Sequence, residues 1–121
     1  MPDASPGNLN GRRSGYTGTR RYVSSATQYT VSESDGGGMV RMTAAAGPVF
    51  VVLGSNVGAG FYVDVMREGA ASTVAFNALD ESVTLLSRGD RTELNGQYAV
   101  GRAECIEPGV WLLSGDLTAG G

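Results

Sequence analysis

The feature that most constrains the fold of this chain is a repeated alternation of apolar and polar residues over short stretches. The clearest example is "FYVDVMRE", in which Phe61, Val63 and Val65 fall on one side and polar or mixed residues on the other. A period of two is typical of a β-strand with one buried face. Seven further stretches are also interpreted as short strands, of which "GPVFVVLG" is a dense β-branched and aromatic run: "TQYTVSES" (27–34), "MVRMTA" (39–44), "GPVFVVLG" (47–54), "STVAFN" (72–77), "SVTLLS" (82–87), "QYAVGRAECI" (97–106) and "VWLLS" (110–114). The sequence therefore predicts about eight short strands.

Helical periodicity is weak throughout the chain. The 19 glycines are spread without a fixed period, and Gly, Asn, Asp or Pro separate the predicted strands. Such spacing is typical of all-β domains. We therefore expect a small antiparallel β-sandwich, jelly roll or barrel. A chain of 121 residues with 41% hydrophobic residues has room for one such domain.

Charge is distributed unevenly along the chain. Residues 1–25 contain four arginines and one aspartate, a net charge of +3, among Pro, Gly, Ser and Thr. Residues 26–121 contain five arginines and eleven carboxylates, a net charge of −6. We interpret 1–25 as an extended basic arm and 26–121 as the all-β domain; a merely solvated terminus is the alternative. The residues expected to bind an acidic partner are Arg12, Arg13, Tyr16, Arg20, Arg21 and Tyr22.

The residue types exclude several kinds of chemistry. The chain has neither His nor Lys, so a serine triad lacks its base, a phosphate loop lacks its lysine, and a zinc site lacks its ligands. The remaining acids, such as Asp80 with Glu81 and Asp90 with Glu93, stand beside turn residues. We interpret them as solvated turn acids rather than a glycosidase pair or a calcium site, and expect no enzyme activity, metal or cofactor. The tripeptide 88–90, Arg-Gly-Asp, fits an ordinary tight turn better than an adhesion motif.

Two single residues lie in the last predicted strands. Cys105, the only cysteine, and Trp111, the only tryptophan, are predicted to pack inside the domain. Alternation places Cys105 on the same face as Ala103 and Glu107. A lone cysteine and an N-terminus without an apolar core indicate assembly in a reducing cytoplasm. No apolar run approaches the roughly 20 residues that a membrane span needs.

The segment from Gly60 to Leu117 resembles small β-modules of tailed-bacteriophage virion proteins, found in capsid decorations and tail fibres. The resemblance covers about half of the chain. It consists of a Gly-aromatic alternating strand, a Ser/Gly turn, a Thr-x-Leu step, a Gln-Tyr-Ala strand and a closing strand with Trp and Gly-Asp-Leu. The matching positions are Gly60, Phe61, Val63, Val65, Leu86, Ser87, Gly89, Thr92, Leu94, Gln97, Tyr98, Ala99, Trp111, Gly115, Asp116 and Leu117. It implies a non-enzymatic virion component that is commonly trimeric.

The basic arm and the short length favour one member of that class. We expect a capsid decoration or cement protein on the virion surface, bound to the major capsid protein or another virion protein. A tail, baseplate or fibre component is the first alternative. A carbohydrate- or host-binding module using Tyr62, Tyr98 or Trp111 is the second. Nucleic acid is a less favoured partner for the arm, because the body of the chain is acidic.

Overall fold

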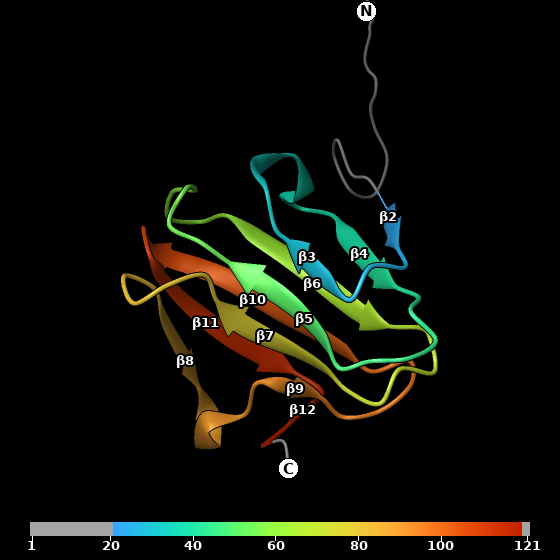
Figure 1. Ribbon diagram of the computed structural model, residues 1–121. Helices are drawn as coiled ribbons and strands as arrows, with labels where there is room; N and C mark the ends of the chain where they lie inside the picture. The colour runs from blue at the N-terminus through green and yellow to red at the C-terminus, as the bar shows by residue number, and fades with distance from the viewer. Residues whose placement is uncertain (1–20, 120–121) are drawn as a thin grey trace, which may run out of the picture.

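The computed structural model describes residues 21–119, which form eleven strands and two short 3₁₀ helices (Figure 1). The prediction of an all-β chain is confirmed, and each of the eight predicted strands overlaps one observed strand. The strands form two sheets. The six-stranded sheet contains, in spatial order, β2 (Arg21–Ser24), β4 (Met39–Met42), β6 (Tyr62–Arg67), β10 (Val100–Glu107), β11 (Val110–Gly115) and β8 (Thr84–Ser87). The five-stranded sheet contains β12 (Leu117–Thr118), β9 (Glu93–Leu94), β7 (Val74–Ala78), β5 (Val49–Leu53) and β3 (Gln28–Thr30).

The chain moves from one sheet to the other at almost every step. Strands β2, β4 and β6 stack in parallel in the six-stranded sheet, and β3, β5 and β7 stack in parallel in the five-stranded sheet. Each circuit therefore adds one strand to each sheet, as in a solenoid. The predicted antiparallel sandwich, jelly roll or barrel is wrong. Alternation in the sequence reports which face of a strand is buried, and it is the same whether the neighbouring strand runs parallel or antiparallel.

The C-terminal half departs from the regular coil. The hairpin β10–β11, which turns at Pro108 and Gly109, lies between β6 and β8. Gly109 has φ of 83°, a left-handed conformation that suits a residue without Cβ. Strand β10 pairs antiparallel with both β6 and β11, whereas β8 pairs parallel with β11. The two closing strands are thus central to the sheet, and β8 forms its edge.

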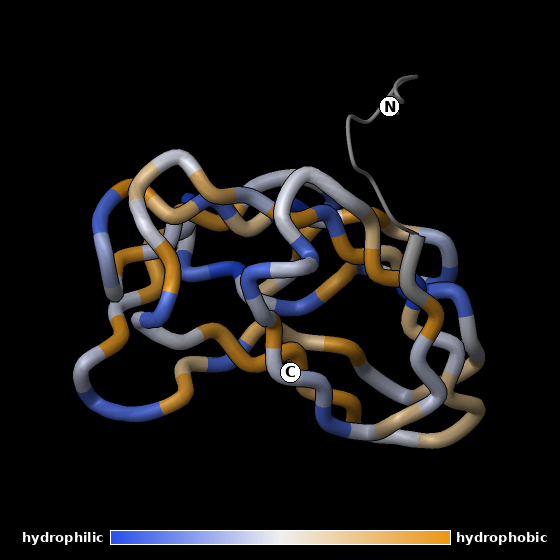
Figure 2. The backbone as a smooth tube through the Cα atoms, turned by 90° about the horizontal axis from the view of Figure 1, so that it is seen from above, coloured by the Kyte–Doolittle hydropathy of each residue, from blue (hydrophilic) through white to orange (hydrophobic). Residues whose placement is uncertain are grey.

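The core lies between the two sheets, which appear as two layers when the molecule is viewed from above (Figure 2). Val63 and Val65 of β6 are fully buried, as the alternation predicts. Cys105 and Trp111 face each other across β10 and β11 and are also buried, which confirms their predicted packing. The Trp111 indole Nε1–H donates a hydrogen bond of 2.8 Å to the carbonyl oxygen of Gly54, and its ring meets Phe61 edge to face.

A β-bulge changes one detail of the predicted faces. The register of β10 against β11 shifts between Cys105 and Glu107. Because a bulge inserts one extra residue, Glu107 turns outward and is exposed, rather than sharing the buried face of Cys105.

Strand β2 lies just before the predicted boundary between the arm (1–25) and the domain (26–121). Arg21–Ser24, the last part of the predicted arm, form β2 and pair in parallel with β4. Residues 1–20 lie outside the described part of the chain. Strand β2 is the edge of the six-stranded sheet opposite β8.

Candidate functional site: the outer face of the six-stranded sheet

The outer face of the six-stranded sheet is divided into a polar half and an apolar half. Alternation turns one set of side chains to the core, so the intervening set projects from the other face. On β4, β6 and the middle of β10 this outer set contains the charged residues Arg41, Asp64, Arg102 and Glu104, together with Tyr62, Met39 and Met66. On the end of β10, β11 and β8 it is largely apolar.

The polar half is organised around Asp64. Only 8% of this residue is exposed, and its carboxylate accepts two hydrogen bonds from the Arg102 guanidinium, at 2.7 Å from Nε and 3.2 Å from Nη2. The same guanidinium lies over the Tyr62 ring, 4.3 Å from its centroid. The hydrogen bond to Asp64 raises the pKa of Arg102 further above its ordinary value. Forked pairing and ring stacking hold this charge in place.

A second ion pair lies nearby on the same face. The Arg41 guanidinium donates to both oxygens of Glu68. This hydrogen bond lowers the pKa of Glu68, so the carboxylate stays ionised in mildly acidic solution.

The apolar half presents three large aliphatic side chains to solvent. Leu86 of β8 is directly opposite Leu112 of β11 in the parallel ladder, and they are 42% and 41% exposed. Ile106, two residues beyond Glu104 on the same face of β10, is 45% exposed. We call Leu86, Leu112 and Ile106 the apolar row. Leu86 and Leu112 are neighbours in the ladder, and adjoining exposed apolar side chains mark an interaction site more often than scattered ones do.

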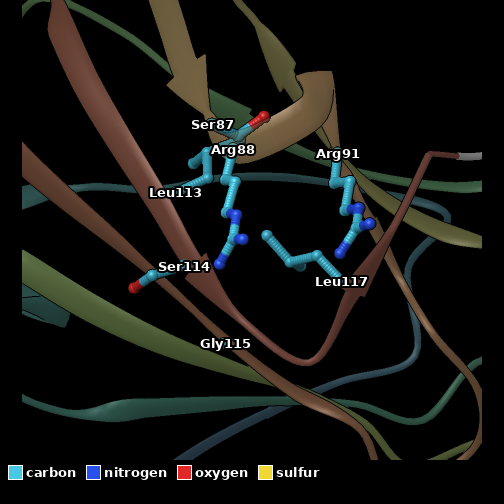
Figure 3. Close-up of a pocket in the computed structure, with 7 residues that line it drawn as sticks. All are labelled: Ser87, Arg88, Arg91, Leu113, Ser114, Gly115 and Leu117. Carbon is cyan, nitrogen blue, oxygen red and sulfur yellow. The ribbon is translucent and has the colours of Figure 1, made fainter.

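A small hollow lies where β8 and β11 end. It has a volume of about 240 Å³ and is lined by Ser87, Arg88, Arg91, Leu113, Ser114, Gly115 and Leu117 (Figure 3). The side chains of Arg88 and Arg91 reach into it on either side of Leu117. Both arginines are exposed.

These two arginines differ from the other arginines whose side chains the structure describes. Arg41 and Arg102 are bound to carboxylates, and Arg67 donates to three backbone carbonyl oxygens. Arg88 and Arg91 have no hydrogen-bond or ion-pair partner among residues 21–119. Two unpaired guanidinium groups in one hollow offer a site for an oxyanion.

The acidic turns are held by their own contacts. The carboxylate of Asp35, in the 3₁₀ helix η1 (Glu33–Asp35), accepts hydrogen bonds from the Tyr29 hydroxyl and from the Ser32 backbone N–H. Asp80 accepts from the Ser82 backbone N–H and hydroxyl, which lowers its pKa. Both carboxylates thus act as turn acceptors of the kind common in Asx-turns and caps.

The other acids and the Arg-Gly-Asp tripeptide lie around β8. Residues 88–90 form the 3₁₀ helix η2 (Arg88–Asp90), in which Gly89 has φ of 68° and Asp90 has φ of 55°. The motif therefore forms a tight turn, as predicted. Glu81 is exposed in the turn before β8, and Glu93 lies in β9. Among residues 21–119, no three His, Cys, Asp or Glu side chains lie close enough together to hold a metal ion.

The predicted arm residues fall largely outside this face. Arg12, Arg13, Tyr16 and Arg20 lie outside the described residues. The backbones of Arg21 and Tyr22 belong to β2, opposite Met39 and Val40 of β4, and their side chains are not described. The structure also shows no membrane-spanning helix between residues 21 and 119.

The sequence did not single out the apolar row or the arginine hollow. Leu112 shares an alternating face with Ser114, and this was the available signal that it points outward. The pairing of β8 with β11, which brings Leu86 to Leu112, connects segments with no pattern to link them.

Comparisons with known proteins add no family to this geometry. No protein-family model, curated protein or solved structure matches the chain.

Proposed function

We propose that this chain is a structural protein of a tailed-bacteriophage virion, acting as a capsid decoration or cement protein. The observation that carries the proposal is the apolar row, because three exposed aliphatic side chains on a sheet favour burial against another protein. The resemblance of Gly60–Leu117 to phage β-modules supplies the kind of assembly. The partner is the major capsid protein or another virion protein, met during assembly in the host cytoplasm.

The arrangement of the six-stranded sheet supports a bridging role. Strand β2, which follows the N-terminal segment in the chain, forms one edge of the sheet, and the apolar row lies toward the other edge, on β10, β11 and β8. Strands in a sheet are about 4.8 Å apart, so five spacings separate the two edges by roughly 24 Å. A protein that reinforces a shell has to contact both sides of a subunit boundary, and two separated surfaces allow this.

The arm provides the second contact. Its basic residues, Arg12, Arg13, Arg20 and Arg21, pair with carboxylates of the neighbouring capsid subunit, and Tyr16 and Tyr22 supply flat apolar contacts. Ordering such a segment on a partner costs conformational entropy, which reduces the net binding free energy. In return, a small protein can contact a large area of the partner's surface.

Two alternatives differ from this proposal in specific ways. A tail, baseplate or fibre component would use the same surfaces but would be present in few copies per particle. A carbohydrate-binding module would lack Trp111 as a stacking platform, because only 1% of this residue is exposed and its indole N–H is bound to Gly54. Tyr98, which is 66% exposed, would then have to serve alone or with Tyr62.

The proposal is tested by binding of purified chain to phage heads that lack it. Leu112→Glu places a charge in the apolar row, and we expect it to weaken head binding by about tenfold or more. Phe50→Glu is the matched control, since Phe50 is a 38% exposed apolar residue in β5 of the other sheet. Circular dichroism checks that both proteins are folded. If Leu112→Glu and the unmodified chain then bind heads equally, the role of this face is refuted.

The arm is tested separately by removing residues 1–20, which leaves β2 in place. We expect the shortened chain to remain folded and to bind heads more weakly, with a smaller dependence on salt, because about three arginines fewer would contact carboxylates. If the shortened chain binds heads as tightly as the full chain, the proposed role of the arm in binding is refuted.

A further inference from the structure

The edge strand β8 has features that natural sheets usually avoid at an exposed edge. Among residues 21–119 its one neighbour is β11, and it lies at the rim of the six-stranded sheet (Figure 1). Its sequence is "TLLS", with neither charge nor proline. Exposed edges are commonly protected by charged residues, proline or a bulge, because unpaired backbone groups favour pairing with another chain.

The unpaired groups of β8 can be assigned from its ladder. The Thr84 N–H donates to the carbonyl of Gly109 at 2.8 Å, which fixes the phase of the parallel pairing with β11. In a parallel ladder alternate residues bond to a given neighbour. Thr84 and Leu86 therefore bond toward β11, and the N–H and C=O of Leu85 point away from the sheet.

Charges of opposite sign flank this strand. Asp80 and Glu81 precede it, and Arg88, Asp90 and Arg91 follow it, so the two flanks carry net charges of −2 and +1. Glu81 is exposed, and the two arginines line the hollow without a partner among the described residues. An antiparallel copy of the same segment would reverse this order and bring each acidic end to a basic end.

We propose that β8 pairs antiparallel with β8 of a second copy of this chain, about a two-fold axis at Leu85. The Leu85 N–H and C=O then exchange two hydrogen bonds with Leu85 of the partner subunit. Arg88 comes opposite Ser82 of the partner subunit, so that Glu81 of the partner subunit lies next to the arginine hollow. A contact of this kind is isologous, and each copy supplies both the strand and the carboxylate that the other copy's hollow receives.

This pairing joins the two six-stranded sheets into one continuous sheet. Thr84 of one copy comes opposite Leu86 of the partner subunit on the outer face, so the two apolar rows become parts of one strip. The symmetry is two-fold, whereas the resemblance to phage modules implies a trimer. The pairing does not depend on the proposed function, and it is measured on the isolated chain without phage heads.

The experiment uses charge reversal in the full chain, with mass measured by light scattering after gel filtration. The unmodified chain is expected to be a dimer at high micromolar concentration. Glu81→Arg and Arg88→Glu are each expected to weaken dimerisation by about tenfold or more, because each places like charges together at both ends of the pair. Glu33→Arg, at an exposed site in η1, is the control for Glu81→Arg because it makes the same change of charge, and it should remain dimeric.

Mixing the two variants gives the decisive result. Glu81→Arg carries two arginines where Arg88→Glu carries two glutamates, so a mixed pair has attractive contacts at both ends. We expect the mixture to form dimers although neither variant does so alone. A chain that is monomeric or trimeric at all concentrations, or variants that fail to restore each other, would overturn the proposal. Loss of dimerisation through misfolding is distinguished by circular dichroism and would not be reversed by mixing.

Discussion

Replacing Trp111 by phenylalanine tests whether the indole is fixed inside the domain by a specific contact. The substitution removes the Nε1 donor and leaves the carbonyl oxygen of Gly54 buried without its partner. An unpaired buried acceptor costs about 1–3 kcal/mol. The smaller ring also leaves a void beside Phe61, which costs about 1–2 kcal/mol more. We therefore expect a loss of roughly 2–5 kcal/mol of unfolding free energy, a large part of the total for a domain of this size.

The measurement is urea unfolding followed by far-ultraviolet circular dichroism, since the variant lacks the tryptophan fluorescence signal. Leu112→Ala is the control, because this neighbour in the same strand points outward and is 41% exposed. Its loss should be below about 1 kcal/mol. A Trp111→Phe loss of less than about 1 kcal/mol, or one equal to that of the control, would show that the indole hydrogen bond and packing contribute little.

Three further predictions concern single residues. Burial raises the pKa of the Cys105 thiol, so its reaction with Ellman's reagent at pH 8 should be slow in the native protein and fast in urea; rapid native labelling would contradict its burial. The hydrogen bond from Arg41 lowers the pKa of Glu68, so the ionised Glu68 stabilises the fold fully above its ordinary pKa of 4.5 and loses this effect as pH falls through the lowered value. Between pH 7 and pH 3, the thermal unfolding temperature should therefore fall less for Glu68→Gln than for the unmodified chain. Equal falls would refute this. A Cβ on Gly69 would overlap backbone carbonyls just after β4, whereas a Cβ on Gly58 would meet open space. In chemical denaturation, Gly69→Ala should lower the free energy of unfolding by about 1–3 kcal/mol, and Gly58→Ala should change it by less than about 0.5 kcal/mol. Similar losses for the two variants would contradict the packing at Gly69.

The sequence predicted the strands well because each strand carries its own burial pattern. Val63 and Val65 alternate with polar residues and are buried together, and the same holds for Trp111 and Leu113. The turn at Gly109 was also predictable, because it lies directly after Pro108 between two apolar runs.

The arrangement of the strands was not predictable in the same way. A strand such as β5 has the same pattern whether its neighbours are reached by hairpins or by a circuit through the other sheet. The position of β8 beyond the later hairpin depends on contacts between distant segments. The two-residue strands β9 and β12 are too short to show a period at all.

The candidate site was predictable only in part. The arm was proposed from its charge, and that proposal remains a prediction because most of it lies outside the described residues. The apolar row was not proposed, since Leu86, Leu112 and Ile106 belong to three strands whose order the sequence does not report. The arginine hollow likewise depends on β8 and β11 ending side by side.

The most direct test of the central proposal is the number and location of copies of this chain in purified virions. Quantitative mass spectrometry of intact particles, followed by separation of heads from tails, measures both. We predict copies in large excess over tail components, remaining with the head fraction and lost when the capsid surface is stripped. Recovery of a few copies with the tail fraction, or absence of the chain from the particles, would contradict the account.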